Sequence, residues 1–281
     1  MNLIADSGSS KTAWCVTKGK ECAQQLFTSG INPFYMEVAQ IEDELRALSV
    51  QIEGEINHVY FYGAGVASTK MSDTLCKWFR KIFPKATVEA HTDLLGAAYA
   101  LCQHKEGIVG ILGTGSNSCF YDGKNIVDTV PPCGFILGDE GSGAALGKQL
   151  VADYLKCRLP ADLHQAFTDY YQLSKDEILD CVYRKAFPNR FLASFTKFLH
   201  EQQAHPYVHT LLSVNFDRFF THNIMHYDYT RYPLHLLGSV AFYFKDIITA
   251  TAAQRHITIG KVEKTALPGL IAYHNDLVIN G

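Results

Sequence analysis

The chain has 281 residues, of which 47% are hydrophobic and 19% are charged, so it has enough apolar material for buried cores. A formal net charge of −3, with no run of more than two Lys or Arg residues, disfavours a nucleic-acid partner. No segment reaches the roughly 18 uninterrupted apolar residues needed to span a bilayer, and residues 1–6 lack a signal-peptide pattern. We therefore expect a cytoplasmic protein of two domains, with no nucleic-acid or membrane partner.

The first hundred residues alternate strand and helix patterns. Apolar runs predict strands, and apolar positions at helical spacing predict helices. The expected strands are 2–6, 13–17, 21–28, 59–62 and 87–90, and the expected helices are 38–50, 71–83 and 94–102. This order predicts an α/β domain with a mixed sheet flanked by helices.

The pattern begins again near Gly107. Strands are expected at 108–112, 116–121 and 126–130, followed by a long helical section over 144–226 that breaks near Pro160, Pro188 and Pro206. The chain then predicts a strand at 234–237, a helix at 239–253, a strand at 257–259 and a terminal helix at 267–274. We expect a duplicated architecture with domains 1–105 and 106–281, the second with a helical insert and a terminal helix able to pack on the first.

Eight cysteines are scattered along the chain, and no pair is separated by two residues. Several lie inside apolar segments, which favours buried free thiols in a reducing compartment.

Two small-residue turns each follow the first strand of a predicted domain. One is Asp6-Ser7-Gly8-Ser9-Ser10-Lys11-Thr12, and the other is Gly113-Thr114-Gly115-Ser116-Asn117. Residues with little side chain let backbone N–H groups approach an anion closely, and an acid at the strand end can hold a hydrated Mg²⁺. Ordinary hairpin turns are the alternative for both segments. The spacing excludes a Walker loop.

The densest signal lies between Gly134 and Gly143. Two adjacent acids, Asp139 and Glu140, stand among four glycines just before an Ala/Leu helix, a pattern that packing alone does not explain. A helix starting near Gly141 offers free N–H groups to an anion or to sugar hydroxyls. A glycine-rich interdomain loop is the alternative.

Two strand-to-helix junctions complete the set. Thr92-Asp93-Leu94 begins a helix, and Asp93 fits either an N-cap or a general base, two roles that are compatible. Leu237-Gly238-Ser239-Val240 joins a strand to a helix, and its glycine allows a flat base to lie against backbone.

In this order the segments resemble the family of N-acetylglucosamine kinases and the related BadF/BadG/BcrA/BcrD ATPases of the actin–hexokinase–Hsp70 superfamily. The resemblance covers nearly the whole chain. Asp6 to Thr12 resembles the first phosphate motif, Gly113 to Ser116 the second, and Gly238-Ser239-Val240 the adenosine motif. Gly138-Asp139-Glu140-Gly141-Ser142 is the most family-specific stretch, and Ser29-Gly30-Ile31-Asn32 resembles the Gly-x-Asn sugar segment.

The resemblance implies two ribonuclease-H-like, actin-like ATPase domains around a central cleft, and transfer of the γ-phosphoryl group of ATP to a small sugar. It makes Asp93 the catalytic base and Asp6 the residue that orients Mg²⁺ through water. It assigns ATP binding to Asp6, Gly8, Ser9, Ser10, Lys11, Thr12, Gly113, Thr114, Gly115, Ser116, Gly238, Ser239 and Val240. It assigns the sugar, by its hydroxyls or an acetamido group, to Asn32, Asp93, Thr114, Gly115, Asp139 and Glu140.

The chain departs from the family pattern in two places. Ser7 and Ser9 stand where family members often carry Gly, and Cys133 precedes Gly134 without the Cys-Ala-Ala-Gly-Thr-Gly motif of the iron–sulfur activating ATPases, which favours the kinase branch. An ATPase that energises a protein partner is the alternative function. A non-catalytic sensor is disfavoured because both Asp6 and Asp93 are retained. The sugar's identity and a homodimer stay open.

Overall fold

The computed structural model describes residues 1–9, 11–19, 21–33, 36–66 and 68–280, with side chains to residue 276. The chain forms two compact units. The first comprises Met1–Glu106, Tyr121–Ile126 and Thr265–Gly281, and the second comprises Gly107–Phe120 and Val127–Lys264. No helix in the described ranges is both long and apolar enough to cross a membrane.

The first unit contains a five-stranded sheet in the order β3-β2-β1-β4-β5. Its strands are β1 Asn2–Ser7, β2 Lys11–Lys18, β3 Glu21–Ser29, β4 His58–Gly63 and β5 Thr87–Thr92. The first three strands pair antiparallel, whereas β4 pairs parallel with both β1 and β5. The helices are α1 Val38–Val50, α2 Thr69–Ile82, α3 Asp93–Cys102 and α13 Leu267–Asn280.

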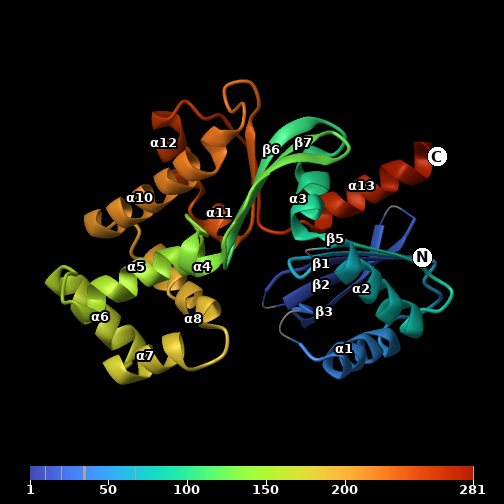
Figure 1. Ribbon diagram of the computed structural model, residues 1–281, viewed down its shortest axis with the longest axis horizontal. Helices are drawn as coiled ribbons and strands as arrows, with labels where there is room; N and C mark the ends of the chain where they lie inside the picture. Colours follow the sequence, from blue (N-terminus) through green and yellow to red (C-terminus); the bar gives the residue numbers. More distant parts are fainter. Residues whose placement is uncertain (10, 20, 34–35, 67, 281) are drawn as a thin grey trace. The chain divides into compact units, whose positions relative to one another are not determined.

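The two faces of this sheet carry different helices (Figure 1). Phe61 of β4 packs against Phe79 of α2, whereas its neighbour Tyr62 packs against His274 of α13. Because side chains alternate along a strand, α2 and α13 lie on opposite faces. On β1 the same alternation places Leu3 in the core beneath α1 and α2, and places Asp6 on the face of α3 and α13.

The second unit repeats the strand topology. Its sheet has the order β10-β9-β6-β7-β8, with β9 parallel to both β6 and β10, so its strands follow the first sheet's order in sequence. The strands are β6 Glu106–Leu112, β7 Ser116–Asp122, β8 Ile126–Val130, β9 Leu234–Leu237 and β10 Ile259–Glu263. This match confirms the duplicated architecture that the sequence predicts.

Helices form most of the remaining second unit. They are α4 Gly134–Leu137, α5 Gly143–Leu155, α6 Ala161–Tyr171, α7 Lys175–Tyr183, α8 Pro188–Ser194, α9 Thr196–Glu201, α10 Pro206–His222, the 3-10 turn η1 Ile224–His226, α11 Ser239–Tyr243 and α12 Lys245–Gln254. Pro188 and Pro206 each occupy the first turn of a helix, where a missing N–H costs nothing. Gly147 lets α5 touch the Leu192 carbonyl, which a Cβ would approach to 1.8 Å.

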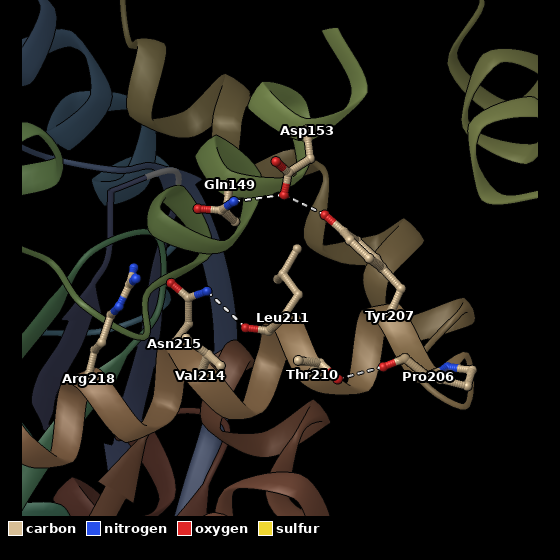
Figure 2. Close-up of a pocket in the computed structure, with 9 residues that line it drawn as sticks. All are labelled: Gln149, Asp153, Pro206, Tyr207, Thr210, Leu211, Val214, Asn215 and Arg218. Atoms are coloured by element: carbon tan, nitrogen blue, oxygen red, sulfur yellow. Dashed lines mark hydrogen bonds between the residues drawn. The ribbon is translucent and has the colours of Figure 1, made fainter. Parts of the chain in front are cut away.

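A cavity of about 440 Å³ lies between α5 and α10 of the second unit (Figure 2). The buried Asp153 carboxylate accepts hydrogen bonds from the Gln149 amide and from the Tyr207 hydroxyl, and Arg158 pairs with its other oxygen at 3.3 Å. These contacts tie α10 to α5. The polar groups at this end of the cavity therefore serve the packing of the unit.

Most predicted elements are confirmed within one or two residues, but some boundaries are wrong. The helix expected over 239–253 divides at Phe244 into α11 and α12, and the last strand begins at Ile259 rather than Ile257. The sequence favoured buried thiols, but a disulfide joins Cys15 of β2 to Cys22 of β3. The other six cysteines form no disulfide among the described residues.

Candidate functional site

The first small-residue turn joins β1 to β2. The Gly8 N–H donates to the Lys11 carbonyl at 3.0 Å and closes the turn. The Ser9 N–H has no hydrogen-bond partner within the described part of the chain, and Ser10 lies outside that part. The Lys11 ammonium is 5.0 Å from the centre of the Phe27 ring. Thr12 is fully buried, and its hydroxyl lies 2.7 Å from that of Ser7, so this hydroxyl faces inward and not toward a phosphate.

Asp6 lies near the end of β1, just before this turn. Its Oδ2 accepts a hydrogen bond of 2.9 Å from the Ala266 N–H, at the start of α13. Burial raises the pKa of the Asp6 carboxyl above its usual value, although the Ala266 N–H and the charge of Lys11 oppose the shift. A nearby cation would relieve this cost of burying the carboxylate.

Asp93 is the first residue of α3, where β5 ends. The N-cap is Thr92, whose hydroxyl accepts a hydrogen bond of 3.1 Å from the Leu95 N–H. The prediction that Asp93 caps the helix is therefore wrong, because the shorter Thr92 side chain already fills that position. Burial raises the pKa of the Asp93 carboxyl to about 6, and the negative charge of Asp6 adds to the shift. The two carboxylates thus lie within electrostatic reach of each other.

Asn32 follows the end of β3 and is 9% exposed. Gly65 leaves room for its side chain, since a Cβ at position 65 would lie 2.7 Å from the Asn32 Oδ1. The first unit therefore carries Asp6, Asn32, Asp93 and the first turn together.

The second turn, Gly113-Thr114-Gly115, joins β6 to β7 in the second unit and rests on α5. The carbonyls of Gly113 and Thr114 accept hydrogen bonds of 2.8 Å and 3.0 Å from the N–H groups of Gly143 and Ala144. The Ser142 hydroxyl caps the next N–H of the helix. The sequence predicted that this helix start offers free N–H groups to a ligand, and that prediction is wrong because the turn itself occupies them.

The amides of the second turn differ in whether they have hydrogen-bond partners. The Gly113 N–H donates to the Gly115 carbonyl at 2.9 Å, and the Ser116 N–H donates to Asp139 at 3.3 Å. Within the described residues, the N–H groups of Thr114 and Gly115 have no hydrogen-bond partner. These two donors resemble the Ser9 N–H of the first turn.

Asp139 lies directly beneath the second turn. A Cβ on Gly115 would lie 2.9 Å from its Oδ2, so the glycine is needed for this approach. Asp139 has a positive φ of 56°, and its side chain is buried, which raises the pKa of its carboxyl to about 6; the Ser116 N–H opposes the shift.

Glu140 points to α10. Its Oε1 lies 3.1 Å from the His222 Nδ1, and its Oε2 accepts from the Asn223 amide at 3.4 Å. Burial raises the pKa of Glu140, but hydrogen bonds outweigh it and leave the pKa below its usual value. The Glu140 carboxyl is therefore favoured in its ionised form, and its contacts with His222 and Asn223 fix it at the end of α10.

The third predicted segment packs against the second turn within the same unit. Gly238, with a φ of 118°, ends β9, and a Cβ there would lie 2.3 Å from the Leu112 carbonyl oxygen and 3.3 Å from the Gly113 nitrogen. Ser239 begins α11, and Val240 is buried. The second unit carries all of these residues, and within it Gly238 approaches Gly113 while Asp139 approaches Gly115 and Ser116.

Two five-stranded sheets of one topology, each with a small-residue turn after its first strand, define an actin-like ATPase fold. A solved structure of a candidate N-acetylglucosamine kinase from Porphyromonas gingivalis is 41% identical, with a TM-score of 0.93 over 98% of this chain and 99% of that chain. The chain belongs to the N-acetylglucosamine kinase-like family of this superfamily.

More distant structures share the fold alone. A candidate N-acetylglucosamine kinase from Chromobacterium violaceum is 16% identical, with a TM-score of 0.73 over 97% of this chain and 98% of that one. A ROK family glucokinase from Streptomyces griseus, in complex with glucose and AMPPNP, is 15% identical, with a TM-score of 0.60 over 99% and 100%. No protein-family model and no curated protein matches the chain.

Proposed function

We propose that the protein transfers the γ-phosphoryl group of ATP to a hydroxyl of N-acetylglucosamine or a related amino sugar, in the cytoplasm. The likeness to the Porphyromonas gingivalis protein supports the substrate class. The observation that carries the chemistry is the state of Asp93. Thr92 fills the N-cap position, so Asp93 is not the helix cap, and burial raises the pKa of its carboxyl to about 6 although the Leu94 N–H opposes the shift.

Asp93 acts as the general base. A base with a pKa near 6 is ionised at neutral pH and still basic enough to accept the proton of the attacking hydroxyl as the oxygen–phosphorus bond forms. The proton passes from the sugar hydroxyl to an Asp93 oxygen, and ADP leaves with the electrons of the broken bond. Holding the hydroxyl beside Asp93 supplies much of the rate gain, because phosphoryl transfer depends mainly on positioning and charge neutralisation.

The first unit supplies Gly8, Ser9, Ser10 and Lys11 to the phosphates. The second unit supplies Gly113, Thr114, Gly115 and Ser116. The unpartnered N–H groups of Ser9, Thr114 and Gly115 support this assignment, because backbone donors without bulky side chains are what a phosphate needs. Gly238, Ser239 and Val240 hold the nucleoside in this proposal, at the close approach of Gly238 to the second turn.

Asp6 suits Mg²⁺. Oxygen ligands are the ones that Mg²⁺ prefers, and it usually keeps several waters, so a single carboxylate can hold it indirectly. One Asp6 oxygen is fixed by the Ala266 N–H, and the buried charge favours a cation nearby. When bound, the ion neutralises the charge that develops on the phosphates.

Asn32, Thr114, Gly115, Asp139 and Glu140 hold the sugar in this proposal. The geometry gives them different parts. Asn32 and Asp93 are the side chains of the first unit assigned to the acceptor, whereas Asp139 also fixes the second turn through the Ser116 N–H. Glu140, held by His222 and Asn223, keeps an oriented charge suited to a hydroxyl.

Release of ADP should be measured against a panel of sugars, for the wild type and for Asp93→Asn. We expect turnover with N-acetylglucosamine and a loss of about 10²- to 10⁴-fold in kcat for the variant, with a smaller change in KM. Turnover that needs no sugar favours the alternative of an ATPase with a protein partner. Undiminished turnover of Asp93→Asn contradicts the role of Asp93.

A further inference from the structure

Gly30 touches the first phosphate turn. A Cβ at this position would lie 2.5 Å from the Gly8 carbonyl oxygen and 2.8 Å from that of Ser9. Real Cβ atoms do not approach backbone atoms so closely, so any side chain at position 30 has to displace the turn or the loop that carries Gly30. The loop and the turn are therefore in backbone-to-backbone contact.

Two buried hydroxyls fasten the same loop to the strands on either side of the turn. Ser7, on β1, and Thr12, on β2, are 1% and 0% exposed, and their oxygens lie 2.7 Å apart. The Ile31 N–H lies 3.2 Å from the Ser7 oxygen and 3.3 Å from the Thr12 oxygen. The hydroxyl oxygens of Ser7 and Thr12 thus both accept a hydrogen bond from the Ile31 N–H of the loop.

The hydroxyl protons can satisfy the remaining acceptors without conflict. The Thr12 hydroxyl donates to the Ser29 carbonyl at 3.2 Å, which leaves its oxygen free to accept from Ser7. The Ser7 hydroxyl can also reach the Ile31 carbonyl at 3.3 Å. Each hydroxyl has one proton to give, and the network uses both inside the protein, where an unmade hydrogen bond is costly.

The next residue after this fastened segment is Asn32. On its other side Gly65 leaves only enough space for the Asn32 side chain, because a Cβ there would lie 2.7 Å from its Oδ1. The position of Asn32 is thus set by the backbone of residues 29–31 and by Gly65. A shift of the first phosphate turn is therefore transmitted to Asn32 through Ile31, the neighbouring residue that is hydrogen-bonded to both hydroxyls.

We propose that Gly30 and the Ser7–Thr12 hydroxyl pair form a positioning link between the first phosphate turn and the sugar-binding Asn32. The inference rests on the proposed function. Nucleotide at the turn and sugar at Asn32 then stabilise the same arrangement of one loop, so each ligand strengthens the binding of the other by an equal factor. Ser7 supplies one of the two hydroxyls of this link.

The test compares Thr12→Val, which has the same shape but no hydroxyl, with Thr12→Ser, which keeps it. N-acetylglucosamine is titrated calorimetrically with and without AMPPNP, and kcat and KM are measured for both substrates. In the wild type we expect AMPPNP to tighten sugar binding at least fivefold. In Thr12→Val that factor should fall below about twofold and kcat should fall roughly tenfold or more, while each ligand alone binds within about threefold of wild type. Thr12→Ser should restore most of the coupling factor and most of kcat.

Gly30→Ala measures the same coupling independently, because its Cβ would displace the turn without removing a hydroxyl. If Gly30→Ala does not fold, the comparison of Thr12→Val with Thr12→Ser still tests the link. Equal coupling and equal kcat in Thr12→Val and Thr12→Ser overturn the link while leaving the proposed function intact. A wild type that phosphorylates no sugar overturns the proposed function, and the link falls with it.

Discussion

The two small-residue turns occupy the same place in two sheets of one topology, yet they are held in different ways. The first is held by side-chain hydroxyls and by the contact of Gly30. The second is held by backbone bonds to the start of α5, by the Asp139 carboxylate and by Gly238. Each turn thus has N–H groups with no hydrogen-bond partner among the described residues, but the contacts that hold the two turns differ. Loss of the Ser7 or Thr12 hydroxyl should affect the first turn, and a methyl group added at Gly238 should affect the second.

The largest effect is expected from Gly238→Ala. Its left-handed φ of 118° strains any side chain, and the new Cβ would lie 2.3 Å from a backbone oxygen. We expect a loss of roughly 3 kcal/mol or more in the free energy of unfolding, measured in urea, and loss of ATP binding measured by calorimetry. Gly113→Ala is the matched control for stability, because its Cβ meets only the Gly115 carbonyl at 4.0 Å. Equal stability of the two variants would contradict this account of the second turn.

The pH dependence of kcat/KM separates the two buried carboxyls. Asp93 must be ionised to accept a proton, and its pKa is raised to about 6, so kcat/KM should fall about tenfold per pH unit below pH 6. The pKa of Asp139 is raised to a similar value, so the profile should also be measured for Asp139→Asn. We expect the acid limb to persist in that variant. If the acid limb disappears in Asp139→Asn, the titrating group is Asp139 and not Asp93.

Asp139→Asn should also change stability, with a sign set by linkage. The folded pKa lies above the ordinary value near 3.9, so ionisation costs stability above about pH 6 and costs nothing below about pH 4. Asn keeps an acceptor for the Ser116 N–H and tolerates a positive φ. We expect urea unfolding to show a gain on the order of 2 kcal/mol at about pH 8 that fades by about pH 4. Asp139→Ala should instead be destabilised, and a less stable Asn variant at the higher pH would refute the assignment.

The smallest effects are expected from the two helix caps. Ser142→Ala and Thr92→Ala should each cost about 1 kcal/mol in thermal unfolding, because each removes the acceptor for one N–H of a helix start. Their consequences for activity should differ. Ser142 supports the helix on which the second turn rests, so its loss should raise KM for ATP, whereas Thr92 positions Asp93, so its loss should lower kcat. Identical kinetic effects would argue against this division of roles.

Local patterns predicted most of the fold. Strand-turn-strand units and proline breaks can be recognised from a few consecutive residues. The predicted strands and most predicted helix starts therefore agree with the structure. The division of the helix at Phe244 and the disulfide between Cys15 and Cys22 escaped prediction, because both depend on neighbours that the sequence does not place together.

The candidate site shows the same limit. The order of the motifs predicted Asp6, Asp93, Asp139 and both turns as site residues. It could not show which N–H groups and which cap position are already used by contacts within the protein. The N–H groups at the start of α5 are taken by the second turn, and Thr92 takes the cap expected of Asp93. Gly30 was noted only as part of a motif, and its contact with Gly8 and Ser9 is a tertiary fact that spacing cannot reveal.

The central claim is that phosphate moves from ATP to a sugar. A single turnover of the wild type with ATP labelled in its γ-phosphate, in the presence of N-acetylglucosamine, tests it most directly. We predict that the label leaves ATP and appears on the sugar in amounts equal to the ADP formed, with little free phosphate. Label recovered only as inorganic phosphate, at the same rate with and without sugar, would contradict the account.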